Sequence, residues 1–480
     1  MRMKLNKEEL RDKILGCWIG KNIGGTIGGP FEGREELLDV KGFTSPKGEP
    51  LPNDDLDLQL VWLRAMEDVG PKLLHANILA DYWLSYIAPH FNEYGTCKAN
   101  LSMGLLPPLS GEVNNGLWHH SNGAWIRSEV WACMAPGIPG IAVKYAIMDA
   151  CIDHGLAEGT CAEIFTAALE SMAFFESDIR TLIHKALAFI PDESRVARSI
   201  KIVLEGYDDG KNWADVRNAV VEDSRDLGMF MAPANVAFVV LGLVYGGGDF
   251  KKSMLYAVNC GDDTDCTAAT CGSIMGIMRG AGNIPEDWKE YIGDEIKNVC
   301  VNGHYRSCVP GTCTELTDRV IAQIPVMFQA YGIDVEMTEE ESSLGDVKPN
   351  DILKGYAEEI MNRSPFSFEI KAEPHTSAVV EYERASIVKA GDDFKVKVSF
   401  RNYRRNPLYL DMDVKLPEGW TADYSHSVFA IHDSIKGNGE GFWEMIIHVG
   451  EHVESINRIP VIAWAYGNAT PVFIPIVLLG

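Results

Sequence analysis

The stretch "NCGDDTDCTAATCG", residues 259–272, contains an unusual excess of carboxylates at the expected start of a helix. Asp262, Asp263 and Asp265 lie within four positions and run directly into small and apolar residues. A single carboxylate at a helix start is ordinary, because free backbone N–H groups and the helix dipole stabilise it. Neighbouring like charges oppose one another, so this excess predicts that something positive lies between the carboxylates.

A second stretch, "PNDDLDLQLVWL" at residues 52–63, places Asp54, Asp55 and Asp57 ahead of another apolar run. Short carboxylates are the hard oxygen ligands that suit Mg²⁺ or Mn²⁺. An EF-hand is excluded, because neither stretch has the glycine at loop position six or the terminal glutamate. The residues alone leave a metal site and two well-capped helices equally open. If the two stretches converge, two ions could share a carboxylate, as in metal-dependent hydrolases.

The composition indicates a well-packed protein of two domains, because 480 residues exceed a single ordinary core. The net charge of −25 argues against a nucleic-acid partner. The N-terminus carries charges where a signal peptide has its apolar core, and the longest apolar run, residues 235–248, is too short to span a bilayer. The 11 cysteines form no CxxC pair, so we expect reduced thiols, a cytoplasmic location and no membrane partner.

Helical periodicity dominates from about residue 8 to 335. It includes two series of glycines spaced four residues apart, which predict close contact between helices in a core. The glycines are Gly16, Gly20 and Gly24 in one series and Gly272, Gly276 and Gly280 in the other.

After residue 335 the pattern changes to two-residue alternation, as in "FKVKVSF" (394–400) and "FWEMIIHV" (442–449), which predicts an antiparallel β-sandwich. The predicted fold class is therefore mainly α, with a C-terminal Ig-like antiparallel β-sandwich. The expected divisions are a helical domain over 1–340, a linker over 341–365 and a β-sandwich accessory domain over 366–480.

Four ordered blocks within residues 8–300 resemble the ADP-ribosylglycohydrolases. They are "DKILGCWIGKNIGGTIGGPFEG" (12–33), "NDDLDLQLVWL" (53–63), "SNGAWIRSEVW" (121–131) followed by "DACIDHG" (149–155), and the opening stretch. The resemblance implies an all-helical orthogonal bundle. It also implies cleavage of an N- or O-glycosidic bond at the anomeric carbon of ADP-ribose, usually with a binuclear Mg²⁺ centre.

The same resemblance implies roles for individual residues. The expected metal ligands are Asn53, Asp54, Asp55, Asp263, Asp265 and Cys266. The expected catalytic residues are Glu32, Asp55 and Asp263, and the expected substrate-binding residues are Asn122, Gly123 and His154. Glu32 is the candidate to assist the leaving group or activate water. Arg127 matches the motif arginine, for which a structural role is equally open.

Four positions depart from the family pattern. Asn53, Leu56 and Cys266 replace threonines, and Gly25 stands where the family has an aspartate. A thiol is a poor partner for Mg²⁺ and prefers softer ions. The resemblance therefore implies a centre with one or two Mg²⁺ ions, with Mn²⁺ as an alternative. Cys266 leaves open whether an ion is lost, exchanged or simply not bound by the thiol.

The leading hypothesis is a metal-dependent glycohydrolase acting on small-molecule or protein-linked ADP-ribosyl groups, or on a related ribosyl or glycosyl compound. One alternative is a glycosidase whose substrate lacks the ADP moiety. A second is a non-catalytic ADP-ribose-binding protein that has lost a metal ion. A homo-oligomer is compatible with each of them.

Overall fold

The computed structural model describes residues 1–372, 376–404, 406–430 and 439–480. These residues divide into two compact units. The first unit comprises residues 1–95 and 115–362, and the second comprises residues 96–114 and 363–480. Residues 96–114 thus belong to the same unit as the C-terminal strands, a grouping that no pattern in the sequence indicates.

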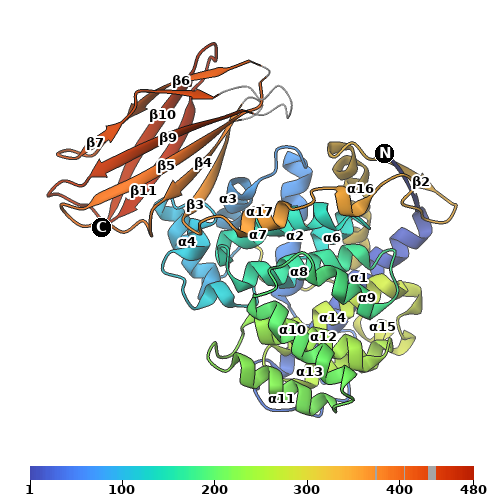
Figure 1. Cartoon of the computed structure of the whole chain (residues 1–480). Coiled ribbons are helices and arrows are strands. Elements are labelled where there is room, and N and C mark those ends of the chain that lie inside the picture. The colour runs from blue at the N-terminus through green and yellow to red at the C-terminus, as the bar shows by residue number, and fades with distance from the viewer. Residues whose placement is uncertain (373–375, 405, 431–438) are drawn as a thin grey trace. The chain divides into compact units, whose positions relative to one another are not determined.

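The first unit is built from helices, as the sequence predicts (Figure 1). Two short strands, β1 (Arg2–Asn6) and β2 (Asp334–Thr338), pair in parallel at its edge. The stretch 341–365, expected to be a linker, contains a helix of its own, α17. The helices are α1 (Lys7–Gly28), α2 (Asp54–Val69), α3 (Ala76–Tyr86), α6 (Glu129–Met134), α7 (Pro139–His154), α8 (Glu158–Met172), α9 (Ile179–Leu187), α10 (Arg195–Asp208), α11 (Trp213–Ser224), α12 (Ala232–Gly246), α13 (Phe250–Asn259), α14 (Thr264–Arg279), α15 (Glu286–Ile292), α16 (Cys313–Ala330) and α17 (Tyr356–Met361).

The glycine series place α1 and α14 in direct backbone contact. The helices run antiparallel, so that Gly20 faces Gly272 and Gly16 faces Gly276. A Cβ atom on Gly20 would lie 2.1 Å from the carbonyl oxygen of Gly272, and one on Gly16 would lie 2.4 Å from that of Gly276. The predicted close packing is confirmed, except that Gly280 follows the last residue of α14 with φ of 76° and ends the helix.

This pairing sets where α1 ends relative to where α14 begins. Gly28, the last residue of α1, accepts a hydrogen bond of 2.8 Å from the Thr264 hydroxyl at the first residue of α14. The chain then continues through the short helix η1 (Gly29–Phe31) to Glu32. Two segments that are more than 200 residues apart in the sequence therefore deliver acidic side chains to one place.

The second unit contains two antiparallel sheets, in agreement with the predicted C-terminal β-domain (Figure 1). The strand orders are β3-β4-β5-β9-β7 and β11-β10-β6-β8. The strands are β3 (Ser367–Ala372), β4 (Thr376–Tyr382), β5 (Asp393–Asn402), β6 (Leu408–Val414), β7 (Thr421–Tyr424), β8 (Ser427–Ala430), β9 (Gly439–His448), β10 (Ile456–Ala465) and β11 (Val472–Leu479). Most of α4 (Asn92–Met103) and all of α5 (Leu109–Glu112) belong to this unit, where Leu105, Leu109 and Val113 join its apolar core.

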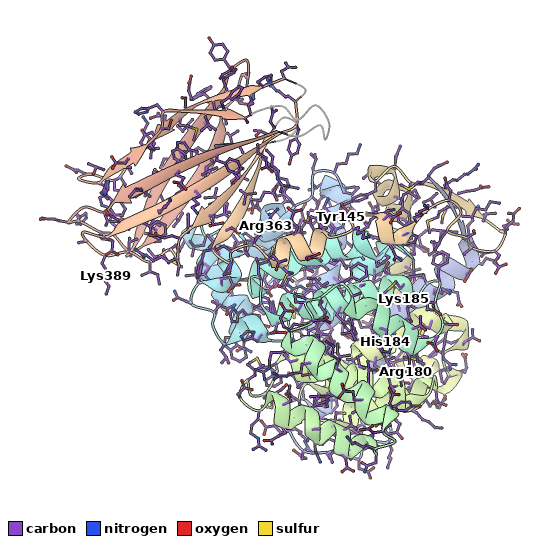
Figure 2. The ribbon with its side chains drawn as sticks, viewed as in Figure 1. Tyr145, Arg180, His184, Lys185, Arg363 and Lys389 are labelled. Carbon is purple, nitrogen blue, oxygen red and sulfur yellow. The ribbon has the colours of Figure 1, made fainter. Side chains whose placement is uncertain are left out.

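Many of the charged side chains lie on the surface in ion pairs. On α9, Arg180 contacts Asp208 and Lys185 contacts Glu176 (Figure 2). Pairs of this kind are solvated and contribute little to stability. Much of the negative net charge is thus ordinary surface charge, and only the buried carboxylates indicate a functional site. Among the described residues, no helix is long and apolar enough to cross a membrane.

We expect Gly20→Ala to lower the free energy of unfolding by about 1–3 kcal/mol, because the new methyl group meets backbone atoms that cannot rotate away. The measurement is urea unfolding followed by circular dichroism. The matched control is Gly303→Ala, since a Cβ atom there meets nothing within 4 Å. Equal stability of the two variants would contradict the close contact of α1 and α14.

A pH effect is expected in the second unit, where His448 lies between Asp393 and Asp423 at 2.6 and 3.2 Å. Hydrogen bonds to these carboxylates raise the pKa of His448 above its usual value. The resulting stabilisation is complete below the unfolded-state pKa of about 6.5 and is lost as the pH rises through the folded-state pKa. His448→Gln should therefore lower the urea midpoint at pH 6 and leave it unchanged at pH 9; a difference of equal size at both values would contradict the assignment.

Candidate metal centre

A pocket of about 270 Å³ lies in the first unit beside the ends of η1, α2 and α14. Its walls combine carboxylates with aromatic rings. The lining residues are Glu32, Asp54, Phe91, Asn92, Glu93, Tyr94, Trp118, Ser121, Asn122, Gly123, Ile126, Phe230, Asp263, Asp265 and Cys266. Most of the residues expected to form the site therefore meet in one cavity.

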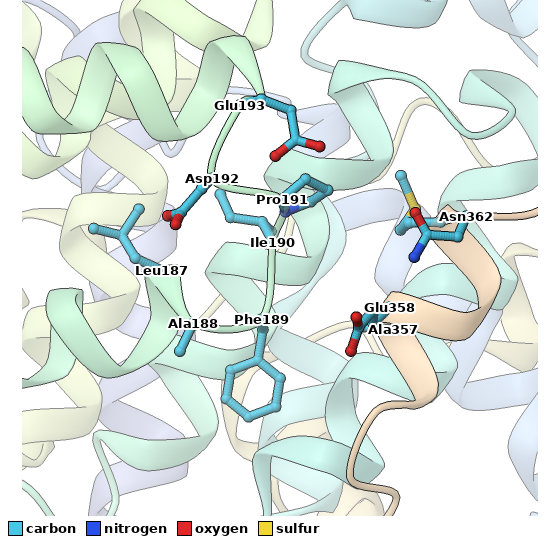
Figure 3. A pocket seen from close by; sticks show the side chains of 11 residues that line it. Leu187, Ala188, Phe189, Ile190, Pro191, Asp192, Glu193, Ala357, Glu358 and Asn362 are labelled. Carbon is cyan, nitrogen blue, oxygen red and sulfur yellow. The ribbon is translucent and has the colours of Figure 1, made fainter.

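A larger cavity, of about 450 Å³, lies between residues 187–193 and α17 (Figure 3). Its acidic side chains include Asp192, which is 91% exposed and pairs with Lys201 on the surface. Among the described residues, both groups of side chains close enough to share an ion include Asp265, which lines the smaller pocket. The chemistry of the walls, and not the volume, identifies the candidate site.

The three carboxylates of the first acidic stretch have different tasks. Asp54 lines the pocket and accepts a hydrogen bond of 3.1 Å from the Tyr94 hydroxyl. Asp55 is fully buried and is not among the residues that line the pocket. Asp57 accepts hydrogen bonds from the backbone N–H groups of Val299 and Cys300, at 2.6 and 2.9 Å, and so fixes a loop.

The second stretch is divided in the same way. Asp262 has a positive φ of 67° and accepts a hydrogen bond of 2.8 Å from the backbone N–H of Phe230, which places that ring in the pocket wall. Asp263 stands at the N-cap position of α14 but makes no side-chain capping bond. Its carboxylate accepts a bond of 2.8 Å from the Asn122 amide and turns to the pocket with that of Asp265. Capping therefore does not account for these two carboxylates.

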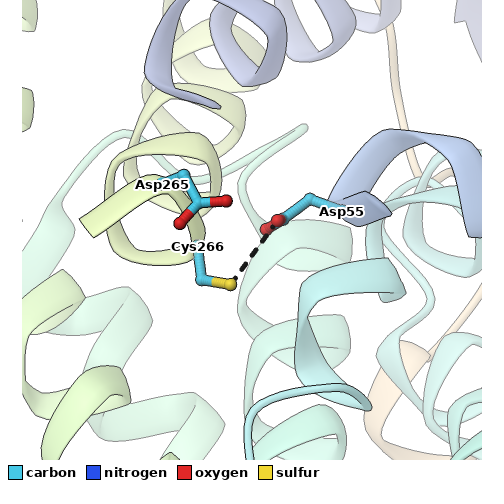
Figure 4. Close-up of side chains that lie close together, drawn as sticks. All are labelled: Asp55, Asp265 and Cys266. Carbon is cyan, nitrogen blue, oxygen red and sulfur yellow. Dashed lines mark hydrogen bonds between the residues drawn. The ribbon is translucent and has the colours of Figure 1, made fainter. Parts of the chain in front are cut away.

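Two groups of potential ligand atoms share Asp265. In each group the atoms lie within 4.8 Å of one another. One consists of Glu32, Asp263 and Asp265; the other consists of Asp55, Asp265 and Cys266 (Figure 4). Among the described atoms, Oδ1 of Asp263 and Oδ1 of Asp265 are buried without a hydrogen-bond partner. Oδ1 of Asp55 also accepts no hydrogen bond, but the ammonium of Lys21 lies 3.8 Å from it. Buried carboxylate oxygens are costly without a partner, so the residues fit a divalent cation.

Burial and crowding raise the pKa values of these groups. Burial and the charge of Asp55 raise the pKa of Asp263 to about 7. Partial burial and the charge of Asp54 raise the pKa of Glu32, although Glu32 is the exposed member of the cluster. A cation bound among them would favour the ionised form of each carboxyl group and reverse these shifts.

Asn53 is the expected ligand whose side chain is already engaged. Its amide oxygen accepts a hydrogen bond of 2.8 Å from the Asp55 backbone N–H and caps α2. Its amide nitrogen occupies the space beside Gly25, where a Cβ atom would lie only 1.8 Å away. Two of the departures noted in the sequence, Asn53 and Gly25, thus fit each other in space.

The residues expected to bind substrate lie at different depths. Asn122 and Gly123 line the pocket. His154 is not among the lining residues; it is fully buried, with Nε2 3.0 Å from the Ser121 hydroxyl and Nδ1 2.9 Å from Asp153. Any effect of His154 on substrate would therefore pass through Ser121.

Arg127 is also fully buried and lies behind the pocket wall. It donates to Asp149 and Asp153 at 2.7 Å and to the carbonyl oxygen of Gly123. Although burial raises the pKa of Asp153, Arg127 and His154 lower it to about 2. These contacts give the motif arginine a role in holding the loop that carries Gly123.

Several residues around the site were not predicted from the sequence. Glu93 and Phe230 line the pocket, and burial with the nearby charge of Asp153 raises the pKa of Glu93 to about 8. Lys21 and Glu129 form a fully buried ion pair of 2.7 Å close to Asp55. Lys21 could have been noticed, because it interrupts the apolar and small residues of "LGCWIGKNIGG". Glu93 and Phe230 lie in segments without a recognisable pattern.

The protein is thus mainly helical in its first unit, and helix ends that are distant in the sequence place their carboxylates in one pocket. The family model of the ADP-ribosylglycohydrolases matches residues 6–321, and the chain belongs to this family. An uncharacterised protein of Archaeoglobus fulgidus is 38% identical over 305 residues, which cover 59% of this chain and 93% of that protein. A solved structure named ADP-ribosylglycohydrolase-related protein complex is 19% identical and covers 67% of this chain and 99% of its own, with a TM-score of 0.46.

Asn122→Ala should weaken binding of Mn²⁺ by about 10–100-fold, because the amide orients the Asp263 carboxylate through a hydrogen bond. Isothermal titration calorimetry measures the change. Asn283→Ala, which removes a surface amide bonded to the Arg279 carbonyl, is the control and should bind as the wild type does. Unchanged affinity in Asn122→Ala would show that Asp263 does not need this partner.

Proposed function

We propose that the protein is a metal-dependent glycohydrolase. It cleaves the glycosidic bond at the anomeric carbon of an ADP-ribosyl group or of a related ribosyl or glycosyl compound. One observation carries the proposal: carboxylates from the end of η1, the start of α2 and the start of α14 meet in a pocket with aromatic walls. Family membership supports the same class of reaction.

The carboxylates Glu32, Asp263 and Asp265 would hold a divalent cation such as Mg²⁺ or Mn²⁺, with Asp54 and Asp55 beside them. When bound, such an ion orients sugar hydroxyls and lowers the pKa of water. The aromatic rings of Phe91, Tyr94, Trp118 and Phe230 form part of the remaining walls.

Glu32 is our candidate for the group that acts on the reacting bond. It is exposed at the mouth of the pocket and belongs to the same group as Asp263 and Asp265. An ionised carboxylate beside a bound cation can accept a proton from the attacking water. We assign this role to Glu32.

A second candidate substrate is a glycoside without the ADP moiety. Five of the lining residues are carboxylates, and none of the described lining residues is a lysine or an arginine. A diphosphate would find no cationic side chain in these walls, whereas a neutral or cationic leaving group would meet no repulsion. This observation favours a substrate whose charged part lies outside the pocket or is missing.

The test compares hydrolysis of ADP-ribosyl-arginine, ADP-ribosyl-serine and simple aryl glycosides, with Mg²⁺ and after chelation. We expect metal-stimulated turnover of at least one of them, its loss in Asp263→Ala and a decrease of about 10²–10⁴-fold in Glu32→Gln. Asp192→Asn, in the larger cavity, is the control and should retain full activity.

The products separate the candidates. Cleavage of the aryl glycoside alone would select the substrate without ADP. Stoichiometric binding of ADP-ribose without hydrolysis of any compound would contradict the proposal and support a binding protein.

A further inference from the structure

Lys21 is an unexpected cation at the bottom of the centre. It projects from α1 and is fully buried, with its ammonium nitrogen 2.7 Å from Glu129 Oε1 and 3.8 Å from Asp55 Oδ1. Glu129 also accepts hydrogen bonds of 2.9 Å from Gln59 and from Ser273. The ammonium group of Lys21 is therefore held by the Glu129 carboxylate, which Gln59 and Ser273 hold in turn.

The side of the centre nearest Asp55 is poorly suited to a divalent cation. One oxygen of Asp55 faces the ammonium of Lys21, and the other accepts a bond of 3.5 Å from the Cys266 thiol (Figure 4). Asn53, the neutral ligand expected there, uses its amide oxygen to cap α2. A buried ammonium repels a second cation close by, and a thiol is a poor ligand for Mg²⁺.

The opposite side has the properties that a hard cation requires. Glu32, Asp263 and Asp265 supply oxygens within 4.8 Å of one another. Oδ1 of Asp263 and Oδ1 of Asp265 are buried without a hydrogen-bond partner among the described atoms, and both residues line the pocket. Asn122 holds the remaining oxygen of Asp263 at 2.8 Å.

We propose that the centre binds one divalent cation, on Glu32, Asp263 and Asp265, and that the ammonium of Lys21 is the fixed positive charge on the Asp55 side. The inference rests on the proposed metal-dependent function but concerns the number of ions. Asp55 then pairs with Lys21 and Cys266 stays a thiol. The excess of carboxylates is balanced by one exchangeable cation and one cation that belongs to the chain.

The first measurement counts Mn²⁺ ions on the wild-type chain by equilibrium dialysis, and electron paramagnetic resonance shows whether the ions interact. We expect one ion per chain with the spectrum of isolated Mn²⁺. Two ions per chain, or the spectrum of an exchange-coupled pair, would overturn the inference. No binding at all would overturn it too.

The second measurement changes the two obstacles to a second ion. The Lys21→Met, Cys266→Thr double variant should bind two Mn²⁺ ions per chain. The matched control combines Cys266→Thr with Lys13→Met, another α1 lysine, which pairs with Glu9 at 2.9 Å away from the centre; it should bind one. A double variant that is folded by circular dichroism and still binds one ion, or a control that binds two, would refute the role of Lys21.

If the Lys21 variant does not fold, the wild-type ion count and spectrum still decide the proposal. The readouts do not depend on turnover. One bound ion without hydrolysis of any glycoside leaves this inference standing and removes the proposed function. Two bound ions with hydrolysis would overturn this inference and leave the proposed function standing.

Discussion

The rest of the first unit depends on the backbone contact between α1 and α14. Because glycines face each other along this contact, the helices approach more closely than side chains would permit. This close contact fixes the direction of both helices and brings the last residue of α1 beside the first residue of α14. Glu32 and Asp265 lie more than 200 residues apart in the sequence, yet they meet because the two helices cannot slide past each other without a clash.

Burying several carboxylates close together costs free energy. The fold limits this cost because the carboxylates have different partners. Asp57 and Asp262 turn to backbone N–H groups and anchor loops. Asp54, Asp263 and Asp265 turn to the pocket instead, and burial is the main cause of the raised pKa of each of them. Asp55 lies closest to a cation that the chain itself supplies, and this asymmetry distinguishes one half of the centre from the other.

Much of this organisation could be predicted from the sequence. The helical region, the C-terminal antiparallel strands and the glycine contact follow from local periodicity, and the two acidic stretches do meet. The ion pair of Lys21 with Glu129 could not be predicted, because it joins α1 to a short helix more than 100 residues away. For the same reason nothing in residues 96–114 indicated that Leu105 and Leu109 complete a core of strands.

The sequence by itself determined the family, the secondary-structure class of each unit and the acidic residues among which the site had to be sought. These are properties of spacing along the chain, where a period of two or of about 3.6 residues fixes which side chains share a face. Only the tertiary structure decided which carboxylates anchor loops, which face the pocket and which one meets an ammonium group. Those outcomes depend on what packs opposite each face, and long-range packing, unlike periodicity, is not encoded in neighbouring residues.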